Sequence, residues 1–416
     1  MRIHLLKASG LIYAKFLIDG NGQFMNSDIV IVSAARTPMG AFQGNLSTVN
    51  APDLGANVIR AVIEGSGVDK EYIDEVLMGN VLSAGIGQAP ARQAALNAGL
   101  SQATSCVTIS KVCGSGMKSV MLACDQIKAG SIQVAIAGGM ENMSLAPYFI
   151  PKARGGLRLG HGEIVDHMFY DGLQNAYDGQ LMGCFADANS KADNITREQM
   201  DEYAVESLKR AQNAVNKGYF DAEISAVTIQ TRKGDITVDA DESPQTAKPE
   251  KIPTLRPAFG KEGLVTAANT SSISDGAAAL LVMSAEKAKA LNLKPLAVIK
   301  AHASHSREPE RFTHAPIDAI KKLLKKVNWT VADVDLFEVN EAFAMVAIAA
   351  INELKLPHKK VNINGGATAL GHPIGASGAR IIVTLLHALK RTGKTKGIAS
   401  LCIGGGEATA IAIELI

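Results

Sequence analysis

The sequence lacks any marked excess of one charge. Its 416 residues include 42 Lys and Arg against 40 Asp and Glu, a formal net charge of +2 at pH 7, and contain no long basic block. Nucleic-acid-binding proteins typically concentrate basic residues on one face or in one segment. The composition therefore argues against a nucleic-acid partner.

Long hydrophobic runs are also missing. The longest apolar run, around residues 344–351, is far shorter than the ~18 residues that predict a membrane-spanning helix. With 47% hydrophobic and 20% charged residues, the chain can nevertheless bury a large core. We expect a soluble protein of two to three domain-sized units, with no membrane partner.

The sequence has few cysteines, and they are widely spaced. The five cysteines show no close spacing of the metal-binding or redox type: Cys106, Cys113, Cys124, Cys184 and Cys402. This spacing predicts free thiols in a reducing compartment and no metal site.

The first residues are excluded from the fold prediction. They carry three basic residues against one acid, Asp19, which superficially fits a transit peptide, whereas Lys15 interrupts the apolar stretch and argues against a secretory signal. We interpret residues 1–27 as an N-terminal extension. The predicted location is cytoplasmic, or the mitochondrial matrix if the extension is a transit peptide.

Short apolar runs alternate with helical stretches in the rest of the chain. Strands are predicted at 29–32, 76–78, 107–109 and 134–136, and helices at 89–98 and 116–127. The second helix ends at Ala129-Gly130, a good stop signal. This alternation predicts an α/β layered fold.

The second half of the chain reads as a repeat of the first. Residues 73–80 can be laid on 333–340, Cys113 and His372 each open a Gly/Ser-rich turn that enters a helix, and 138–141 resembles 404–407. We predict two stacked, βαβ-rich halves around a pseudo-twofold axis, sharing one site. The segment between them, rich in Gly, Asp and Lys, predicts an inserted domain that covers a ligand or an oligomer surface.

Cys113 is the first candidate for chemistry. It stands in Lys111-Val112-Cys113-Gly114-Ser115-Gly116, directly after a predicted strand and at the start of a helix. A helix N-terminus favours thiolate over thiol, and the glycines let a bulky substrate approach the backbone. We favour a nucleophile over a buried structural cysteine here.

His372 is the second candidate. Glycines surround it in Gly371-His372-Pro373-Ile374-Gly375, and Pro373 fixes the entry to a helix. The ring could take the thiol proton from Cys113 or donate to a carbonyl oxygen.

Two further residues complete the candidate set. Cys402 ends an apolar strand and runs into three glycines, 404–406; alone it would be structural, but beside Cys113 and His372 a base is credible. Asn340 could either cap the following helix or belong to the active site.

These segments together resemble the thiolases, from about Asp28 to Ile416. The motifs occur in family order: Cys-Gly-Ser-Gly at Cys113, Asn-Glu-Ala-Phe at Asn340, Gly-His-Pro at Gly371 and Cys-x-Gly-Gly-Gly at Cys402. The resemblance implies two duplicated βαβαβαββ halves in an α-β-α-β-α arrangement with an inserted loop domain. The implied boundaries are 28–143 with 272–293 for the N-terminal half, 144–271 for the loop domain and 294–416 for the C-terminal half.

The resemblance also implies the roles. Cys113 would be the acylated nucleophile, His372 would activate it, Cys402 would exchange the α-proton, and Asn340 would hold a water that polarises the thioester oxygen. The N–H groups of Cys113 and Gly404 would form the oxyanion hole. Coenzyme A would run along the loop domain, which would also serve oligomerisation, and the family's contacts correspond to Leu173, Met182, Phe259, Ala267, Ser271 and Phe343.

No metal or redox cofactor is implied, and a homotetramer or homodimer is expected. Glu308-Pro309 with Phe312, and Thr266-Ala267-Ala268-Asn269, look like the acetoacetyl-CoA thiolases of the mitochondrial type, a branch that includes potassium-activated enzymes. The implied activity is the reversible condensation of two acetyl-CoA to acetoacetyl-CoA and CoA.

Two departures matter. Leu181 stands where short-chain biosynthetic members often have His, and Gln245 stands where many members have a basic residue, so that Lys248 or Lys251 would serve the nucleotide phosphates. The runner-up is a broad-range 3-ketoacyl-CoA thiolase of fatty-acid β-oxidation.

Three other classes are weaker alternatives. A decarboxylating ketoacyl synthase usually pairs its nucleophile with two histidines, which Cys402 argues against. A noncatalytic carrier would not need all of Cys113, His372 and Cys402. A dinucleotide-binding oxidoreductase would show Gly-x-Gly-x-x-Gly after its first strand, which is missing.

Overall fold

The computed structural model describes residues 28–416; the predicted extension, 1–27, lies outside the described residues. Nine strands follow one another in a sheet in the order β12-β13-β14-β11-β1-β10-β5-β3-β4, and β2 pairs with β10. Their bounds are β1 Ile29–Arg36, β2 Gly40–Ala41, β3 Glu75–Gly79, β4 Ser105–Ile109, β5 Val134–Asn142, β10 Ser274–Ser284, β11 Ala297–Ser306, β12 Leu336–Val339, β13 Lys396–Ile403 and β14 Glu407–Leu415. The predicted strands of the first half are all confirmed.

The two halves pair their strands in the same way. β5 runs antiparallel to β10 and parallel to β3, just as β13 runs antiparallel to β14 and parallel to β12. β3 pairs in parallel with β4, and a parallel bridge between Phe337 and Val361 takes the corresponding place beside β12. The predicted duplication is therefore confirmed by strand order and direction.

The strand register corrects one part of the predicted repeat. Val76 pairs with Ile136, and its counterpart Leu336 pairs with Gly397. Counting five residues onward from these pairs, along β5 and along β13, shows that Glu141 of the first half corresponds to Cys402 of the second. The proposed match of 138–141 with 404–407 is wrong, because the first segment lies within β5 and the second includes the turn after β13.

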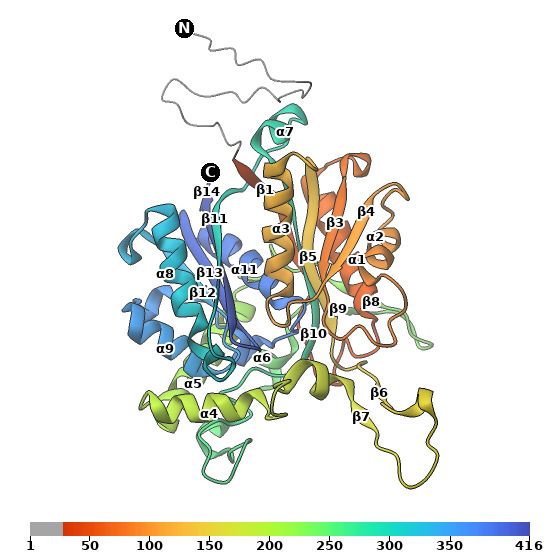
Figure 1. Cartoon of the computed structure of the whole chain (residues 1–416). Helices are drawn as coiled ribbons and strands as arrows, with labels where there is room; N and C mark the ends of the chain where they lie inside the picture. The colour runs from red at the N-terminus through yellow and green to blue at the C-terminus, as the bar shows by residue number, and fades with distance from the viewer. Residues whose placement is uncertain (1–27) are drawn as a thin grey trace, which may run out of the picture.

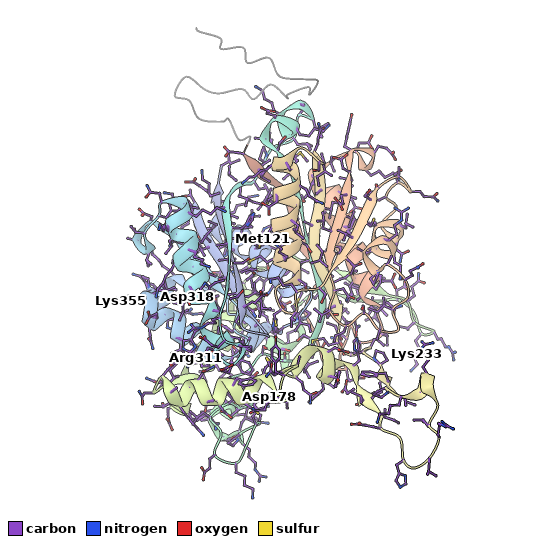
Figure 2. The ribbon with its side chains drawn as sticks, viewed as in Figure 1. Met121, Asp178, Lys233, Arg311, Asp318 and Lys355 are labelled. Carbon is purple, nitrogen blue, oxygen red and sulfur yellow. The ribbon has the colours of Figure 1, made fainter. Side chains whose placement is uncertain are left out.

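Helices form three layers around the sheet strands (Figure 1). α1 and α2 pack on the outer face of the first half, α8 and α9 on the outer face of the second, and α3 contacts α11 between them. Met121 on α3, labelled at the centre of Figure 2, is 2% exposed, whereas Asp318 on α8 and Lys355 at the end of α9 lie on the outer side. The bounds are α1 Ala51–Ser66, α2 Pro90–Asn97, α3 Ser115–Ala129, α7 Ala285–Ala290, α8 Ala315–Val327, α9 Ala344–Leu354, α10 Ala367–Leu370 and α11 Ser377–Thr392.

Glycines bring the entries of α3 and α11 into direct contact. A Cβ atom on Gly139 would lie 2.0 Å from the carbonyl oxygen of Gly375, and one on Gly116 would lie 2.9 Å from the backbone nitrogen of Ala379. Real Cβ atoms do not approach so closely, so any side chain here would push the halves apart. The absence of side chains is what lets both helix entries share one site.

The chain leaves the first half after β5 and returns as β10. The intervening elements are β6 Tyr148–Phe149, β7 Val165–Asp166, a π-helix at Met168–Leu173, α4 Met182–Ala192, α5 Arg197–Asn216, β8 Val227–Ile229, β9 Ile236–Val238 and α6 Glu242–Thr246. The buried Arg36 of β1 binds Glu223 at 2.5 Å and Asp241 at 2.6 Å, which fixes this segment to the sheet. The β6–β7 hairpin projects from the body at the lower right of Figure 1. Across residues 28–416, every helix is too short or too polar for a membrane crossing.

Candidate active site

One cavity of about 210 Å³ brings together residues from both halves and from the intervening segment. Cys113, His372 and Gly404 line it together with apolar side chains. Phe343 lies edge-on to Phe259 and to Phe312, with ring centroids 6.4 Å and 6.3 Å apart. Five of the six predicted CoA contacts line this cavity: Leu173, Met182, Phe259, Ser271 and Phe343.

Cys113 lies on a tight turn before α3. The preceding residue, Val112, has a φ of 45°, which is strained for a β-branched side chain. Ser115, the first residue of α3, donates from Oγ to the Val112 carbonyl at 2.7 Å and accepts from the Lys111 N–H at 2.8 Å. The serine therefore holds the turn that presents the thiol to the cavity.

Burial changes the expected state of the Cys113 thiol. Desolvation raises its pKa to about 11, although the backbone N–H groups of Gly404 and of Cys113 itself hydrogen-bond the sulfur and favour the thiolate. The N–H groups at this turn favour the thiolate, but desolvation is the larger effect, so the thiol stays protonated in the free protein. A base must therefore take the proton during reaction.

His372 is held in one tautomer by Ser377. The Ser377 Oγ donates to the Pro373 carbonyl at 2.8 Å, so its single proton is used, and it can only accept from His372 Nδ1, 2.6 Å away. Nδ1 therefore carries the proton and Nε2 carries a lone pair. The buried Nε2 has no hydrogen-bond partner within residues 28–416.

The imidazole is neutral at physiological pH. Burial, followed by the positive charge of Arg380, lowers the pKa of His372 to about 3. A neutral ring with an unprotonated Nε2 beside a neutral thiol is the arrangement of a general base and its nucleophile.

Cys402 is fully buried at the end of β13, two residues before Gly404. Its pKa is raised well above the usual value, first by burial and next by the nearby charge of a Cys113 thiolate. The two sulfurs are therefore electrostatically coupled, and Cys402 is a thiol while Cys113 is unmodified.

Asn340 does not cap the next helix. α9 begins at Ala344 with Phe343 at its N-cap position, so the capping alternative is wrong. The Asn340 backbone N–H donates to the Ser400 carbonyl at 2.9 Å, and its buried Nδ2 has no partner in the described part of the chain. A buried amide donor without a partner is costly, which makes it a candidate binding group.

Ala267 lies in a neighbouring cavity instead. This second cavity, about 280 Å³, is lined by Lys248, Lys251, Ala267 and Ser272 among others, while the adjacent Ser271 lines the first. Consecutive residues, 271 and 272, therefore line the two cavities. Lysines lie in the cavity next to the one that contains the thiol.

Sequence reasoning missed two residues of the site. Ser377 sits five residues after His372, a spacing that would have suggested a hydrogen bond only once the turn was known. Glu141, whose pKa is raised to about 7 by burial, accepts from the N–H groups of Val81, Leu82 and Gly375, and so anchors the His372 loop. Buried carboxylates of this kind carry no sequence signature.

Metal ligands do not cluster in the described residues. Within 28–416, no group of three or more His, Cys, Asp and Glu side chains could hold an ion. Of the four predicted catalytic residues, Cys113 and His372 line the cavity, whereas Cys402 and Asn340 are buried and are not part of its lining.

Comparison with known proteins agrees with this geometry. The family model "Thiolase, N-terminal domain" matches residues 29–286, and "Thiolase, C-terminal domain" matches 293–415. The chain is 51% identical to an acetyl-CoA acetyltransferase of Cupriavidus necator over 390 residues, covering 93% of this chain and 99% of that protein. It is 51% identical to the enzyme of that name from Escherichia coli over 387 residues, covering 92% and 98%.

Solved structures are similar over the same length. The acetyl-CoA acetyltransferase of Bacillus anthracis superposes with a TM-score of 0.92 at 42% identity, covering 94% of this chain and 99% of that one. The Acat5 thiolase of Ascaris suum in complex with coenzyme A gives 0.89 at 42% identity, covering 94% and 100%. The chain, an acyltransferase by fold and by family, belongs to the thiolases.

Proposed function

We propose that this protein is an acetyl-CoA C-acetyltransferase. It would catalyse the reversible condensation of two acetyl-CoA to acetoacetyl-CoA and CoA through an acyl-cysteine. The observation that carries the proposal is that a neutral, tautomer-fixed His372 and the partly buried thiol of Cys113 line the same apolar cavity. Similarity to acetyl-CoA acetyltransferases over nearly the whole chain supports the substrate.

The first half-reaction acylates Cys113. His372 Nε2 takes the thiol proton while sulfur attacks the thioester carbonyl, and the oxyanion is stabilised by the N–H groups of Cys113 and Gly404. Those two N–H groups favour negative charge on the sulfur, so they already point toward the reacting centre. The departing CoA thiolate takes the proton of Cys402, and His372 remains protonated.

The second half-reaction forms the carbon–carbon bond. Burial is the main cause of the raised pKa of Cys402, and acylation excludes the additional repulsion from a Cys113 thiolate, which makes the Cys402 thiolate easier to maintain. That thiolate takes an α-proton from a second acetyl-CoA, and a water held by Asn340, together with protonated His372, stabilises the enolate oxygen. The enolate attacks the acyl group, Cys113 leaves as thiolate, and His372 returns its proton.

The two adjoining cavities fit the two ends of coenzyme A. The apolar cavity suits the thioester and its pantetheine arm, along Leu173, Met182, Phe259, Ser271 and Phe343. Lys248 and Lys251 in the neighbouring cavity, which also contains Ala267, would bind the nucleotide phosphates in place of the basic residue missing at Gln245.

A broad-range 3-ketoacyl-CoA thiolase is the second candidate. Leu181, an apolar residue where short-chain members often have His, lines the cavity and favours it. Comparing cleavage rates of acetoacetyl-CoA and 3-ketooctanoyl-CoA separates the two activities. The acetyl-transfer assignment requires kcat/KM to be higher for the shorter substrate.

The projecting hairpin supports an oligomer. It exposes apolar side chains that a monomer rarely displays together, including Tyr148, Leu157, Leu159 and Ile164, of which Leu159 is 98% exposed. We propose that this hairpin joins copies into a homotetramer. A Leu157→Ser, Leu159→Ser variant should sediment as a smaller particle, and an unchanged mass would contradict the assignment.

No cofactor is needed for the proposed steps, and coenzyme A thioesters enter as substrates. Potassium activation is tested by exchanging K⁺ for Na⁺ at constant ionic strength. The reduced thiols that the steps require suit the cytoplasm, or the mitochondrial matrix if residues 1–27 are a transit peptide.

Acyl-enzyme trapping tests the proposed chemistry. After incubation with labelled acetyl-CoA, peptide mapping should find label on Cys113, and Cys113→Ala should bind none. Cys106→Ala, at a cysteine on β4 outside the cavity, is the matched control and should be labelled like the unmodified protein. Label on any other residue would refute the assignment.

A further inference from the structure

The proposed steps leave one buried charge unused. Arg380, in the first turn of α11, is 0% exposed and is among the largest fully buried side chains of the described residues. Burying a guanidinium without full pairing is expensive, so such a residue needs a reason to be there.

Neighbouring side chains do not supply all the hydrogen bonds that the Arg380 guanidinium can make. The closest carboxylate oxygen is that of Glu338, 3.9 Å from Nη1, and among the described residues Nε and Nη1 have no hydrogen-bond partner. Burial raises the pKa of Glu338 to about 8 even though Arg380 opposes the shift, so this carboxyl is mostly protonated at neutral pH. The charges of Glu223 and Asp241 also act on Arg380, but among the described residues no carboxylate oxygen hydrogen-bonds its guanidinium.

The remaining contact is with the active site. Arg380 Nη2 lies 3.5 Å from Oδ1 of Asn340, a long contact in which charge and dipole interact. A guanidinium can only donate, so the amide must turn its oxygen toward Arg380. Nδ2, which has no other partner within 28–416, is thereby turned the opposite way as a free donor.

The same turn of α11 also orients His372, the group that acts together with Asn340 in the proposed mechanism. Ser377, three residues earlier on α11, fixes His372 with Nε2 free. The charge of Arg380 also contributes, after burial, to keeping that ring neutral before acylation. The start of α11 thus orients both groups that stabilise the enolate oxygen in the proposed mechanism.

We propose that Arg380 is a positioning residue that fixes the amide orientation of Asn340, so that its Nδ2 holds the water that donates to the enolate oxygen during condensation. This inference rests on the proposed function and adds a requirement to its second half-reaction. Acylation of Cys113 uses backbone N–H groups and the neutral His372, whose lowered pKa is caused first by burial, so it does not depend on Arg380 directly.

Separate assays of the two half-reactions test the proposal. Arg380→Met should lower condensation by about 100-fold while acylation of Cys113 changes by less than about 3-fold, since losing one positioned donor costs about that much. Arg380→Lys keeps a cationic donor and should restore part of the loss. Lys118→Met, at the corresponding position of α3, is the matched control and should leave both rates unchanged.

A double-mutant cycle identifies the partner. Combining Arg380→Met with Asn340→Ala should cost no more than Asn340→Ala alone, because both changes remove the same donor. Losses that multiply, or unimpaired condensation by folded Arg380→Met, would overturn the proposal.

Asn340→Asp keeps the test open if Arg380→Met does not fold. Its carboxylate can accept from Arg380 but cannot donate to the water, so condensation should fall as far as in Asn340→Ala. Retained condensation by Asn340→Asp would show that the donor is not needed and would sink the inference. Failure of unmodified protein to acylate Cys113 would instead refute the proposed function.

Discussion

The entries to α3 and α11 are built alike but carry different chemistry. Ser115 and Ser377 are the first residues of the two helices, and each Oγ donates to a backbone carbonyl just before the helix, at 2.7 Å and 2.8 Å. In the first half the serine accepts from a backbone N–H of the same turn. In the second it accepts from the ring of His372. The serine that stabilises the turn in the first half therefore has a counterpart in the second half that orients the catalytic base, His372.

Another pair of matched residues, Asn80 and Asn340, also differs in hydrogen bonding between the two halves. Asn80 and Asn340 both follow the strand that precedes a helix, yet Asn80 Nδ2 donates to Glu141 and to the Met140 carbonyl, whereas Asn340 Nδ2 is unpartnered within residues 28–416. By strand register, Glu141 of the first half also occupies the position that corresponds to Cys402 in the second. The matched amide nitrogen is therefore hydrogen-bonded in the first half and, among the described residues, left without a partner in the second.

This difference teaches how a duplicated fold can host one site. The first half contributes the nucleophile and, through Glu141 on the Gly375 N–H, part of the support for the histidine loop. The second contributes the groups that move or stabilise charge. Changes at matched positions should therefore affect stability in one half and the reaction in the other.

Of the changes that test this difference between the halves, Cys402→Ala should lower the condensation rate the most. Removing the general base should lower condensation by about 10²–10⁴-fold, while labelled acetyl-CoA still acylates Cys113. Isotope exchange between the methyl protons of acetyl-CoA and solvent measures the lost step. Unchanged exchange in this variant would exclude Cys402 as the base.

Ser377→Ala should give an intermediate effect. Without the acceptor at Nδ1, His372 samples the wrong tautomer, and both half-reactions should slow by about 10-fold to 100-fold. Stopped-flow acylation measures the first half-reaction directly. Ser115→Ala, the counterpart in the first half, should lower the free energy of unfolding by about 1 kcal/mol and slow acylation less. Equal kinetic losses in both variants would remove the distinction between the halves.

The sequence was sufficient for the framework and for the groups that react. Apolar runs bounded by turn residues predicted β1, β3, β4 and β5; β1, β3 and β5 are buried strands, which are nearly continuous in hydrophobicity. Cys113 and His372 were identifiable because each stands in a glycine-rich turn at a helix entry. Both now line one cavity.

The remainder depended on distances that the sequence does not encode. The sequence could not predict how strongly desolvation raises the pKa of the Cys113 thiol, because solvent access is a tertiary property. The orientation of His372 needed the hydroxyl of Ser377, and the cap expected at Asn340 failed because α9 begins later, at Ala344. Arg380 could be recognised only once its guanidinium was seen to lack a full partner.

Glu141→Gln should act on the first half through stability, and its effect should be visible in the pH dependence of the free energy of unfolding. The folded-state pKa of Glu141 is raised from 4.5 to about 7, first by burial and against the N–H groups of Val81, Leu82 and Gly375. Between these two values the folded protein binds more protons than the unfolded chain, so the contribution of Glu141 to the free energy of unfolding falls as pH rises.

The size of that effect follows from the shift. Glutamine has no such proton, so the difference in unfolding free energy between native protein and Glu141→Gln should shrink by up to about 3 kcal/mol from pH 4.5 to pH 7. Urea unfolding at fixed protein concentration measures it, and the contributions of Glu338 and Asp275 cancel because both remain in the two proteins. A difference that stays constant with pH would mean that Glu141 is ionised throughout, and that the first half holds the histidine loop with a charge instead of a neutral acid.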